Sequence, residues 1–355
     1  MNSDFLKFQN LKVFPNLDLF RALSIVLVML HHSPIPNDIL KIVMKNGNHG
    51  VSIFFIISGF LISTLLIREK ERGSINIKNF LIRRGLRIYP LYYTVLLAYY
   101  IAINYFGFFS QSNQQHFNDY LFSHIFYFSN LVSISGPFFF SWSLSTEEQF
   151  YFIFSFVIKK FSSLRILYFL IFILAVKILF YYFVYVPMYM KPMVNFIHYG
   201  LRVFQEAILL GVILAILMSH QRSFDLVKKI CDKVFYPSVA CFLYILFFQV
   251  IGRHSTITAQ LFNLSFVIIL FRSVTSPSLD KYIGSRLYNA ISYVGLISYG
   301  IYLFHMIVSN SLFKLNITND FYLFFLIWLF VVILIASISF ELYERRFMKM
   351  KSKFK

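Results

Sequence analysis

The strongest constraint on this chain is a series of long apolar runs separated by short polar stretches. A run of about 16 to 24 residues can cross the ~30 Å hydrocarbon core of a bilayer as a helix, which satisfies all its backbone groups internally. The composition agrees, since 58% of the residues are hydrophobic and only 14% are charged. The sequence therefore predicts an all-α integral membrane protein, a bundle of about ten transmembrane helices. The runs lie near residues 17–33, 50–67, 87–106, 142–158, 164–186, 198–218, 235–251, 257–273, 289–312 and 321–342.

One more apolar segment, residues 120–132, is too short to cross comfortably. Counting it as a crossing would place Lys159 and Lys160 on the outer side, so we expect a short re-entrant or interfacial helix there. The domain organisation that follows is a cytoplasmic segment over 1–16, one transmembrane domain over 17–344 and a basic cytoplasmic tail over 345–355.

The formal charge of +18 is distributed unevenly along the chain. Cytoplasmic loops of membrane proteins are rich in lysine and arginine, so this distribution predicts orientation and gives no reason to expect a nucleic-acid partner. We expect a multi-pass protein of the inner (plasma) membrane with both termini in the cytoplasm. The predicted outer side holds only Lys41, Lys45, Lys191, Arg253 and Lys314, and the other basic clusters lie in 7–12, 68–87, 159–165, 222–233, 272–286 and 345–355.

The first apolar run, "LDLFRALSIVLVMLHHS", carries an arginine and two histidines. Arg21 and His32 are eleven residues apart, close to three helical turns, so both side chains project from one face roughly 16 Å apart along the axis. Asp18 lies one turn before Arg21 on the same side. Charge facing lipid is costly, which favours a position inside the bundle or a wet cavity. The alternative, in which Arg21 snorkels to the cytoplasmic surface and the histidines lie at the outer interface, stays open.

A second segment, "NFLIRRGLRIYPLYY", places three guanidiniums at the cytoplasmic mouth of a run. Arg83 and Arg84 precede Arg87 by four and three residues, which makes them neighbours on a helix. Guanidinium presents a planar pair of donors to phosphate oxygens, so the cluster is a candidate phosphate clamp. The alternative is a basic collar that only sets topology or attracts anionic lipid.

A third segment, "SWSLSTEEQFYFIF", places Glu147 and Glu148 several residues into an aromatic, apolar run. Acids inside a membrane need a partner, and they could neutralise Arg21, orient an imidazole or hold a proton. Alternatively, they could stay wet in the first turn of a helix that begins after Ser143 or Ser145. The segment "SYGIYLFHM" adds His305 as a candidate substrate contact. No histidine or acid has a recognisable metal-ligand spacing, so we expect no metal.

Five segments, in this order, resemble the membrane-bound acyltransferase 3 family, whose members move acyl groups, often acetyl, from a cytoplasmic donor to extracytoplasmic acceptors. These are "LDLFRALSIVLVMLHHS", "GVSIFFIISGFLIS", "FLIRRGLRIYPLYY", "SWSLSTEEQFYF" and "ISYGIYLFH". The chain departs from the family pattern at Ser52, where the family often has aspartate. It departs again after Glu344, where the family often has proline. These departures leave the roles of Ser52 and Glu344 open.

The resemblance implies a membrane O-acyltransferase, and more narrowly an O-acetyltransferase of surface polysaccharides. By position it marks His32 as the essential histidine with Arg21 as its partner, and Glu147 and Glu148 as site residues. It assigns Arg83, Arg84 and Arg87 to the acyl-CoA donor. No permanently bound cofactor is implied, and the partners are acyl-CoA, a carbohydrate acceptor and the lipid bilayer. The acyl group, the acceptor and the oligomeric state stay open.

Two mechanisms suit His32, which could act as general base for an acceptor hydroxyl or carry the acyl group as an acyl-imidazole. The competing function class is a transporter or flippase for a lipid-linked or small amphiphilic substrate, in which buried charges bind cargo or relay protons. The chain has no detectable inverted repeat and no paired helices broken by glycine or proline, which favours the enzyme.

Overall fold

A computed structural model describes residues 3–14, 16–33, 41–73, 75–132, 135–188, 197, 201–248 and 256–354 of this chain. These residues form helices and connecting turns, and no strand occurs among them. Lys191 and Arg253, two of the cations predicted for the outer side, fall outside the described residues.

The chain divides into two compact units, and each is assembled from three separate stretches of sequence. Unit 1 comprises Met1–Gly73, Phe161–Ile171 and Glu206–Ser298. Unit 2 comprises Ser74–Lys160, Phe172–Gln205 and Tyr299–Lys355. Helix α9 (Ser163–Phe180) begins in unit 1 and ends in unit 2.

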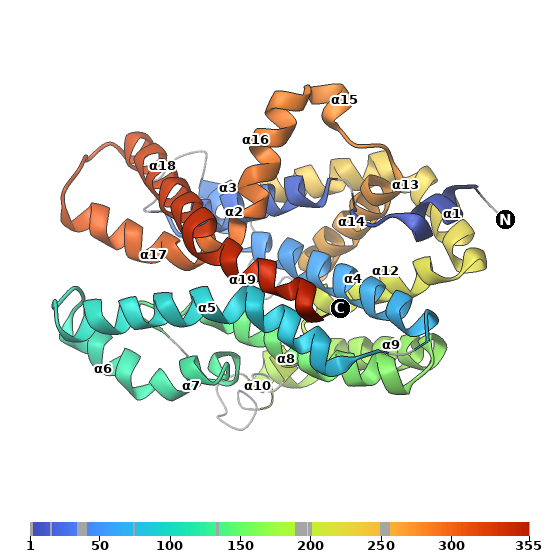
Figure 1. Cartoon of the computed structure of the whole chain (residues 1–355), viewed down its shortest axis with the longest axis horizontal. Coiled ribbons are helices and arrows are strands. Elements are labelled where there is room, and N and C mark those ends of the chain that lie inside the picture. The colour runs from blue at the N-terminus through green and yellow to red at the C-terminus, as the bar shows by residue number, and fades with distance from the viewer. Residues whose placement is uncertain are drawn as a thin grey trace. The chain divides into compact units, whose positions relative to one another are not determined.

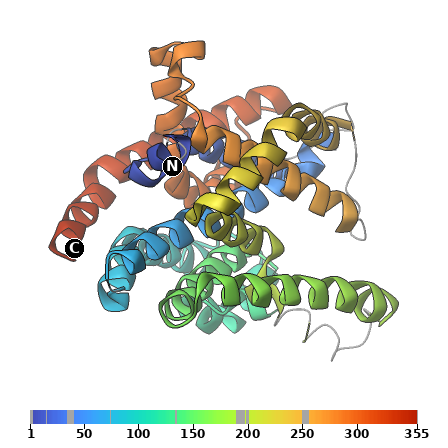
Figure 2. The ribbon, with the colours of Figure 1, turned by 90° about the vertical axis from the view of Figure 1, so that its right-hand side faces the viewer.

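Unit 1 is built around α2 and α4, which contact each other. Helices α12 and α14 pack against α4, α13 packs against α12 and α14, and α16 lies along α2. In Figures 1 and 2, α15 (orange) projects away from the other helices of this unit, beyond the start of α16. Its helices are α1 (Ser3–Asn10), α2 (Leu17–His31), α3 (Lys41–Asn46), α4 (His49–Glu71), α12 (Glu206–Ser219), α13 (Gln221–Phe248), α14 (Thr256–Thr275), α15 (Asp280–Ile283) and α16 (Ser285–Leu296).

Glycines set the closest helix contacts of unit 1. A Cβ atom on Gly59 of α4 would lie 2.2 Å from the Ile208 carbonyl oxygen, and one on Gly211 of α12 would lie 2.2 Å from that of Ile56. Small residues let membrane helices approach backbone to backbone, where dispersion rather than hydrophobic burial holds them together. The α4–α12 pair therefore has room for a hydrogen atom but for no side chain at these two positions.

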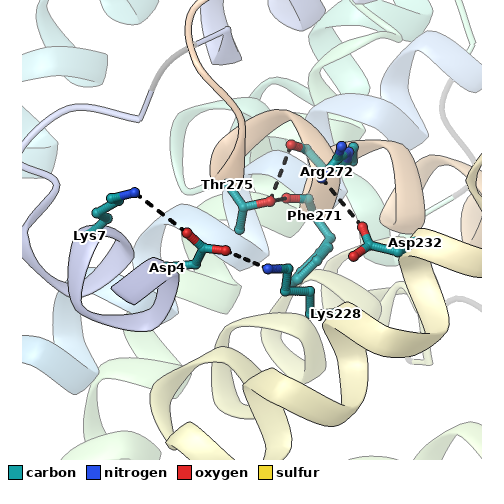
Figure 3. A network of polar contacts seen from close by, with 7 residues as sticks. All are labelled: Asp4, Lys7, Lys228, Asp232, Phe271, Arg272 and Thr275. Carbon is teal, nitrogen blue, oxygen red and sulfur yellow. Dashed lines mark hydrogen bonds and ion pairs between the residues drawn. The ribbon is translucent and has the colours of Figure 1, made fainter. Parts of the chain in front are cut away.

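Polar contacts tie the N-terminal helix to α13, and α13 to α14, within unit 1 (Figure 3). Asp4 of α1 forms ion pairs with Lys7 and with Lys228 of α13. Further along α13, Asp232 lies 3.3 Å from the Arg272 guanidinium near the end of α14. The segments that carry Lys7, Lys228 and Arg272, all predicted for one side of the membrane, are thus joined within this unit.

Unit 2 contains the long helix α5, against which α8 and the last helices of the chain pack. Helices α17 and α18 form a helical hairpin (Figure 1). The elements are α5 (Ile77–Asn104), α6 (Gln111–Asp119), α7 (Leu121–Ile125), η1 (Ser129–Leu131), α8 (Ser141–Lys160), η2 (Tyr181–Tyr185), α10 (Val186–Met188), η3 (Leu201–Phe204), α17 (Ser298–Lys314), α18 (Phe321–Ser339), η4 (Phe340–Glu344), α19 (Arg345–Met350) and η5 (Lys351–Phe354).

Every predicted apolar run is largely helical where it is described, but the count of about ten full crossings is not confirmed. Among the described residues, six helices are long and apolar enough to span a membrane, or seven if α16 and α17 form one broken span. Helices α2 and α12 have only 15 and 14 residues, which at 1.5 Å each fall short of a ~30 Å core. Helix α8 has 20 residues but opens with a polar stretch. The predicted short helix over 120–132 is divided into α7 and η1.

Candidate active site

The predicted pair of Arg21 and His32 belongs to unit 1, and both residues lie at α2. The Arg21 guanidinium pairs with Asp18 one turn earlier, with Nη1 2.5 Å from Oδ1. The Asp18 backbone is fixed from outside the helix, since a Cβ atom on Gly295 of α16 would lie 1.8 Å from its carbonyl oxygen. The ion pair therefore holds Arg21 at a defined place on α2 and offsets the cost of enclosing its charge.

The two histidines at the end of α2 have different surroundings. His31 is the last helical residue, and its Nδ1 lies 3.0 Å from the Met44 carbonyl oxygen of α3. His32 follows the helix, and its backbone N–H donates to the carbonyl oxygens of Val28 and Met29. The two imidazole rings lie 5.1 Å apart. His31 is thus bound to a neighbouring helix.

A third histidine lies close to this pair and was missed by sequence reasoning. His49 opens α4, lies near enough to His31 for their charges to interact, and packs 4.8 Å from the Phe262 ring. Its Nε2 is shielded from solvent and has no hydrogen-bond partner within the described part of the chain. The available sequence signal was the pair of glycines near it, Gly47 and Gly50, which indicates close helix packing. In the structure, Cβ atoms at these two positions would lie within 2.4 Å of carbonyl oxygens of α2.

The three arginines of α5 lie in unit 2 and have three different environments. Arg83 donates from Nη1 to the Phe354 carbonyl oxygen at 2.6 Å. The Arg84 guanidinium lies 4.3 Å above the Tyr151 ring, a cation–π contact, and its charge interacts with Glu148. Arg87 interacts with Glu344 of η4. The three arginines therefore have different partners within the protein, and their role as a phosphate clamp stays a prediction.

Lys351 of η5 lies near two of these arginines. It lies close enough to Arg84 and Arg87 for the three positive charges to interact. Helix α19 and η5 both pack on α5, and the Tyr343 hydroxyl of η4 lies 3.0 Å from that of Thr94 on α5. The end of the chain thus brings a further cation to the arginine cluster, which spacing within "LIRRGLRIYP" could not reveal.

A groove opens beside the start of α5. It has a volume of about 810 Å³, which lies in the usual range for small-molecule sites. Two lysines, one from each of α5 and α8, stand at its otherwise mainly apolar walls. The lining residues are Ile75, Asn76, Ile77, Lys78, Leu81, Ile82, Phe156 and Lys159. The groove ends one residue before the first of the three arginines on α5.

The two glutamates lie in the second turn of α8, which begins at Ser141, and not in a wet first turn. Glu148 interacts with the Arg84 guanidinium, the Tyr89 hydroxyl and the Glu147 carboxylate. One of its oxygens, Oε1, is shielded from solvent and has no hydrogen-bond partner among the described residues. Arg84 is thus the counter-charge that an acid inside an apolar helix requires.

Tyrosines surround this carboxylate. The Tyr299 hydroxyl donates to the Ile88 carbonyl oxygen at 2.9 Å and lies within electrostatic range of Glu147, Glu148 and Glu344. Tyr127 lies within the same range of Glu148. Sequence reasoning missed both, since tyrosines are common in this chain and mark no site by themselves. The "SYGIYLF" motif, which contains Tyr299, was the available signal.

His305, the predicted substrate contact, is completely buried in unit 2. Its Nδ1 lies 2.5 Å from the Tyr302 carbonyl oxygen, and its own carbonyl oxygen accepts from Trp328 Nε1 at 2.8 Å. The ring lies 5.0 Å from that of Phe140. These are the contacts of a packed core residue, and a substrate role for His305 stays a prediction.

The site residues therefore fall into two groups, with Arg21 and His32 in unit 1 and the three arginines, both glutamates and His305 in unit 2. Within unit 2, the charges of Arg84 and Glu148 interact. Arg83 instead donates to the Phe354 carbonyl oxygen, and the charge of Arg87 interacts with Glu344. The described residues contain no group of three or more histidine, cysteine or acidic side chains arranged to hold a metal ion.

Comparison with known proteins identifies the family of this chain. A protein of Staphylococcus aureus (strain COL), provisionally named an O-acetyltransferase, is 26% identical over 97% of this chain, and the match spans 59% of the relative's length. The peptidoglycan O-acetyltransferase OatA of Listeria monocytogenes is 31% identical over 40% of this chain and 24% of its own. No solved structure matches the chain. The acyltransferase domain model of the acyltransferase 3 family matches residues 14–343, and the chain belongs to that family.

Proposed function

We propose that this protein is a membrane O-acetyltransferase that moves an acetyl group from cytoplasmic acetyl-CoA to a hydroxyl of an extracytoplasmic glycan. The observation that carries the proposal is the Arg84–Glu148 pair, set among tyrosines inside a chain of the acyltransferase 3 family. The names of the staphylococcal and listerial relatives support O-acetyl transfer. The listerial name also favours a cell-envelope polysaccharide as acceptor. The uneven distribution of lysine and arginine supports a position in the plasma membrane with both termini cytoplasmic.

The donor would bind at the start of α5. Arg84, Arg87 and Lys351 gather positive charge there, and Arg83 lies beside them. The 810 Å³ groove at the start of the same helix adds Lys78 and Lys159. Guanidinium and ammonium groups together suit the several phosphates of CoA, because each arginine offers a planar donor pair and each lysine a point charge. The acyl arm would then enter the helices along α5 toward Glu148.

Chemistry would run through His32. Acting as general base, its imidazole takes the proton of the acceptor hydroxyl while the oxygen attacks the thioester carbonyl carbon. The carbon–sulfur bond breaks, and the CoA thiolate leaves and takes up a proton. Alternatively, His32 attacks first, releases CoA and passes the acetyl group from an acyl-imidazole to the hydroxyl. Arg21, held by Asp18, would bind the donor or the acceptor.

Donor binding tests the proposal with the purified full-length protein in nanodiscs. Acetyl-CoA and CoA should raise the melting temperature, because both bind the folded state. Arg87→Lys keeps the charge and the topology but loses the planar donor pair, so it should shrink the ligand-induced shift and leave the ligand-free midpoint nearly unchanged. Arg286→Lys, an exposed arginine of α16, is the matched control and should respond like the parent.

Transfer itself is measured with radiolabelled acetyl-CoA and a soluble peptidoglycan fragment. Incorporation of label by the parent protein supports the enzyme. A parent protein that neither binds nor uses acetyl-CoA would favour the competing transporter or flippase. An Arg87→Lys variant that responds like the parent would remove Arg87 from the donor site and leave the enzyme standing.

A further inference from the structure

Tyr127 has a backbone conformation that side chains other than glycine seldom adopt. Its φ is +57°, in the left-handed region. The Gln149 amide of α8 holds it there by donating from Nε2 to the Tyr127 carbonyl oxygen at 2.7 Å. Gln149 is itself fixed by a reciprocal pair of hydrogen bonds with Asn130, at 2.8 and 2.9 Å. Conformations of this kind persist only where surrounding structure imposes them, and they cluster at functional sites.

This clamp directs the Tyr127 side chain into the aromatic wall of α5. Its ring stacks on that of Tyr92 at 4.4 Å and 27°, and the ring of Tyr89 lies 5.7 Å away. Only 7% of the residue is exposed. The hydroxyl is shielded from solvent and meets no hydrogen-bond partner in the described part of the chain.

Two other polar atoms near it share this condition. Glu148 Oε1 and Arg84 Nε are shielded from solvent and likewise have no hydrogen-bond partner among the described residues. Tyr127 and Arg84 both interact with the Glu148 carboxylate. Buried polar atoms are nearly always hydrogen-bonded, so three exceptions around one carboxylate indicate a partner that the described residues do not supply.

We propose that Tyr127, Glu148 and Arg84 form a subsite for a neutral group that both donates and accepts hydrogen bonds, which is a hydroxyl or a secondary amide. Glu148 Oε1 accepts, the Arg84 Nε–H donates, and the Tyr127 hydroxyl can do either. The charges of Arg84 and Glu148 offset each other, so the subsite favours no net charge in its ligand. This inference rests on the proposed function, in which the pantetheine arm of CoA carries secondary amides and the glycan carries hydroxyls.

The test removes one oxygen atom. Tyr127→Phe keeps the ring stack and loses only the unpartnered hydroxyl, so the ligand-free melting temperature should stay the same or rise. Tyr99→Phe is the matched control, because Tyr99 of α5 is a fully buried tyrosine that packs against Phe109 and Phe138. The probes are acetyl-CoA, pantetheine, adenosine 3′,5′-bisphosphate, which lacks the arm, and a soluble peptidoglycan fragment.

Two results would support the subsite and identify its ligand. If it holds an amide of the arm, Tyr127→Phe weakens binding of acetyl-CoA and pantetheine by about three- to tenfold, the loss of one hydrogen bond, and spares the bisphosphate. If it holds a glycan hydroxyl, donor binding is unchanged and the KM for the peptidoglycan fragment rises by a similar factor. In either case Tyr99→Phe behaves like the parent.

Other results would overturn it. Unchanged behaviour of Tyr127→Phe toward every probe would mean that only water meets these atoms. A clear fall in its ligand-free melting temperature would mean that the hydroxyl is bonded within the fold. If the parent protein does not bind acetyl-CoA, the proposed function fails separately. The subsite is then judged by direct binding of pantetheine and of the peptidoglycan fragment, and it falls if neither depends on Tyr127.

Discussion

Gly59 and Gly211 offer a quantitative test of how α4 and α12 are held together. Alanine at position 59 would place its Cβ 2.2 Å from the Ile208 carbonyl oxygen, whereas ordinary contact begins at 3.4 Å. The Ile208 oxygen, and the Ile56 oxygen that an alanine at position 211 would meet, belong to helix backbones, which cannot rotate away as a side chain can. The helices must therefore separate by about 1.2 Å at this point, which follows from those two distances.

The cost can be worked from the atoms that lose contact. A gap of ~1 Å forfeits about half of each dispersion well, and each well is worth about 0.15 kcal/mol. If roughly forty atom pairs across the α4–α12 contact are affected, the loss is ~3 kcal/mol. Alanine returns ~1 kcal/mol through its higher helix propensity. We therefore expect Gly59→Ala, and likewise Gly211→Ala, to destabilise the protein by about 2 kcal/mol.

The double variant makes the test sharper, because one separation of the helices relieves both clashes. Gly59→Ala with Gly211→Ala should cost about 1 kcal/mol, less than either change alone, because the ~3 kcal/mol loss of contact occurs once while each alanine returns ~1 kcal/mol. This corresponds to a coupling of about 3 kcal/mol. Unfolding by SDS from mild micelles, followed by circular dichroism, measures all three variants. Gly85→Ala is the control, since its new Cβ would meet only the Tyr89 side chain, at 3.1 Å. Additive costs, or single variants within 0.5 kcal/mol of the parent, would refute the backbone-contact reasoning.

Three further outcomes are expected. His32→Ala should abolish acetyl transfer, while His31→Ala should retain most activity and lose only the contact with Met44. Equal loss of activity in both variants, with normal membrane insertion, would contradict this difference. Cysteines introduced near Lys229 and in the C-terminal tail should react with impermeant reagents only from the cytoplasm, and one at Asn316 only from outside; reversed labelling would overturn the orientation. Burial lowers the pKa of the His124 imidazole to about 4. As the pH falls below 6.5, this imidazole therefore binds a proton in the unfolded chain but stays neutral in the folded chain until the pH approaches 4. Stability should then fall by up to about 3 kcal/mol between pH 6.5 and 4, and His124→Asn, which does not titrate but can still meet Ser141, should show a flatter pH profile of unfolding.

Much of the helical structure could be predicted from the sequence, because apolar runs of sufficient length have few alternatives to a helix. The run over 17–33 becomes α2 from Leu17 to His31. The expectation that Asp18 lies on the Arg21 side is met by their ion pair. Both follow from local geometry, in which residues three or four apart share a helix face.

The parts that could not be predicted depend on long-range packing. Nothing in the pattern of runs indicates that residues 1–73 join 206–298 in one unit. The partner of Glu148 is Arg84, more than sixty residues away in the sequence, and periodicity within α8 carries no information on that choice. Left-handed backbone is usually signalled by glycine or asparagine, so tyrosine at position 127 gave no warning of the turn between α7 and η1.

The interleaving of the two units has a consequence for biosynthesis. Proteins built from consecutive domains can fold each one as it leaves the ribosome. Here the polypeptide passes from one unit to the other five times, at residues 73, 160, 171, 205 and 298. Unit 1 lacks α16 until residue 296 has been made, and unit 2 lacks the carbonyl group that Arg83 binds until residue 354. Early helices must therefore wait in the bilayer for late ones, and a chain that stalls during translation would leave both halves incomplete and open to quality-control proteases.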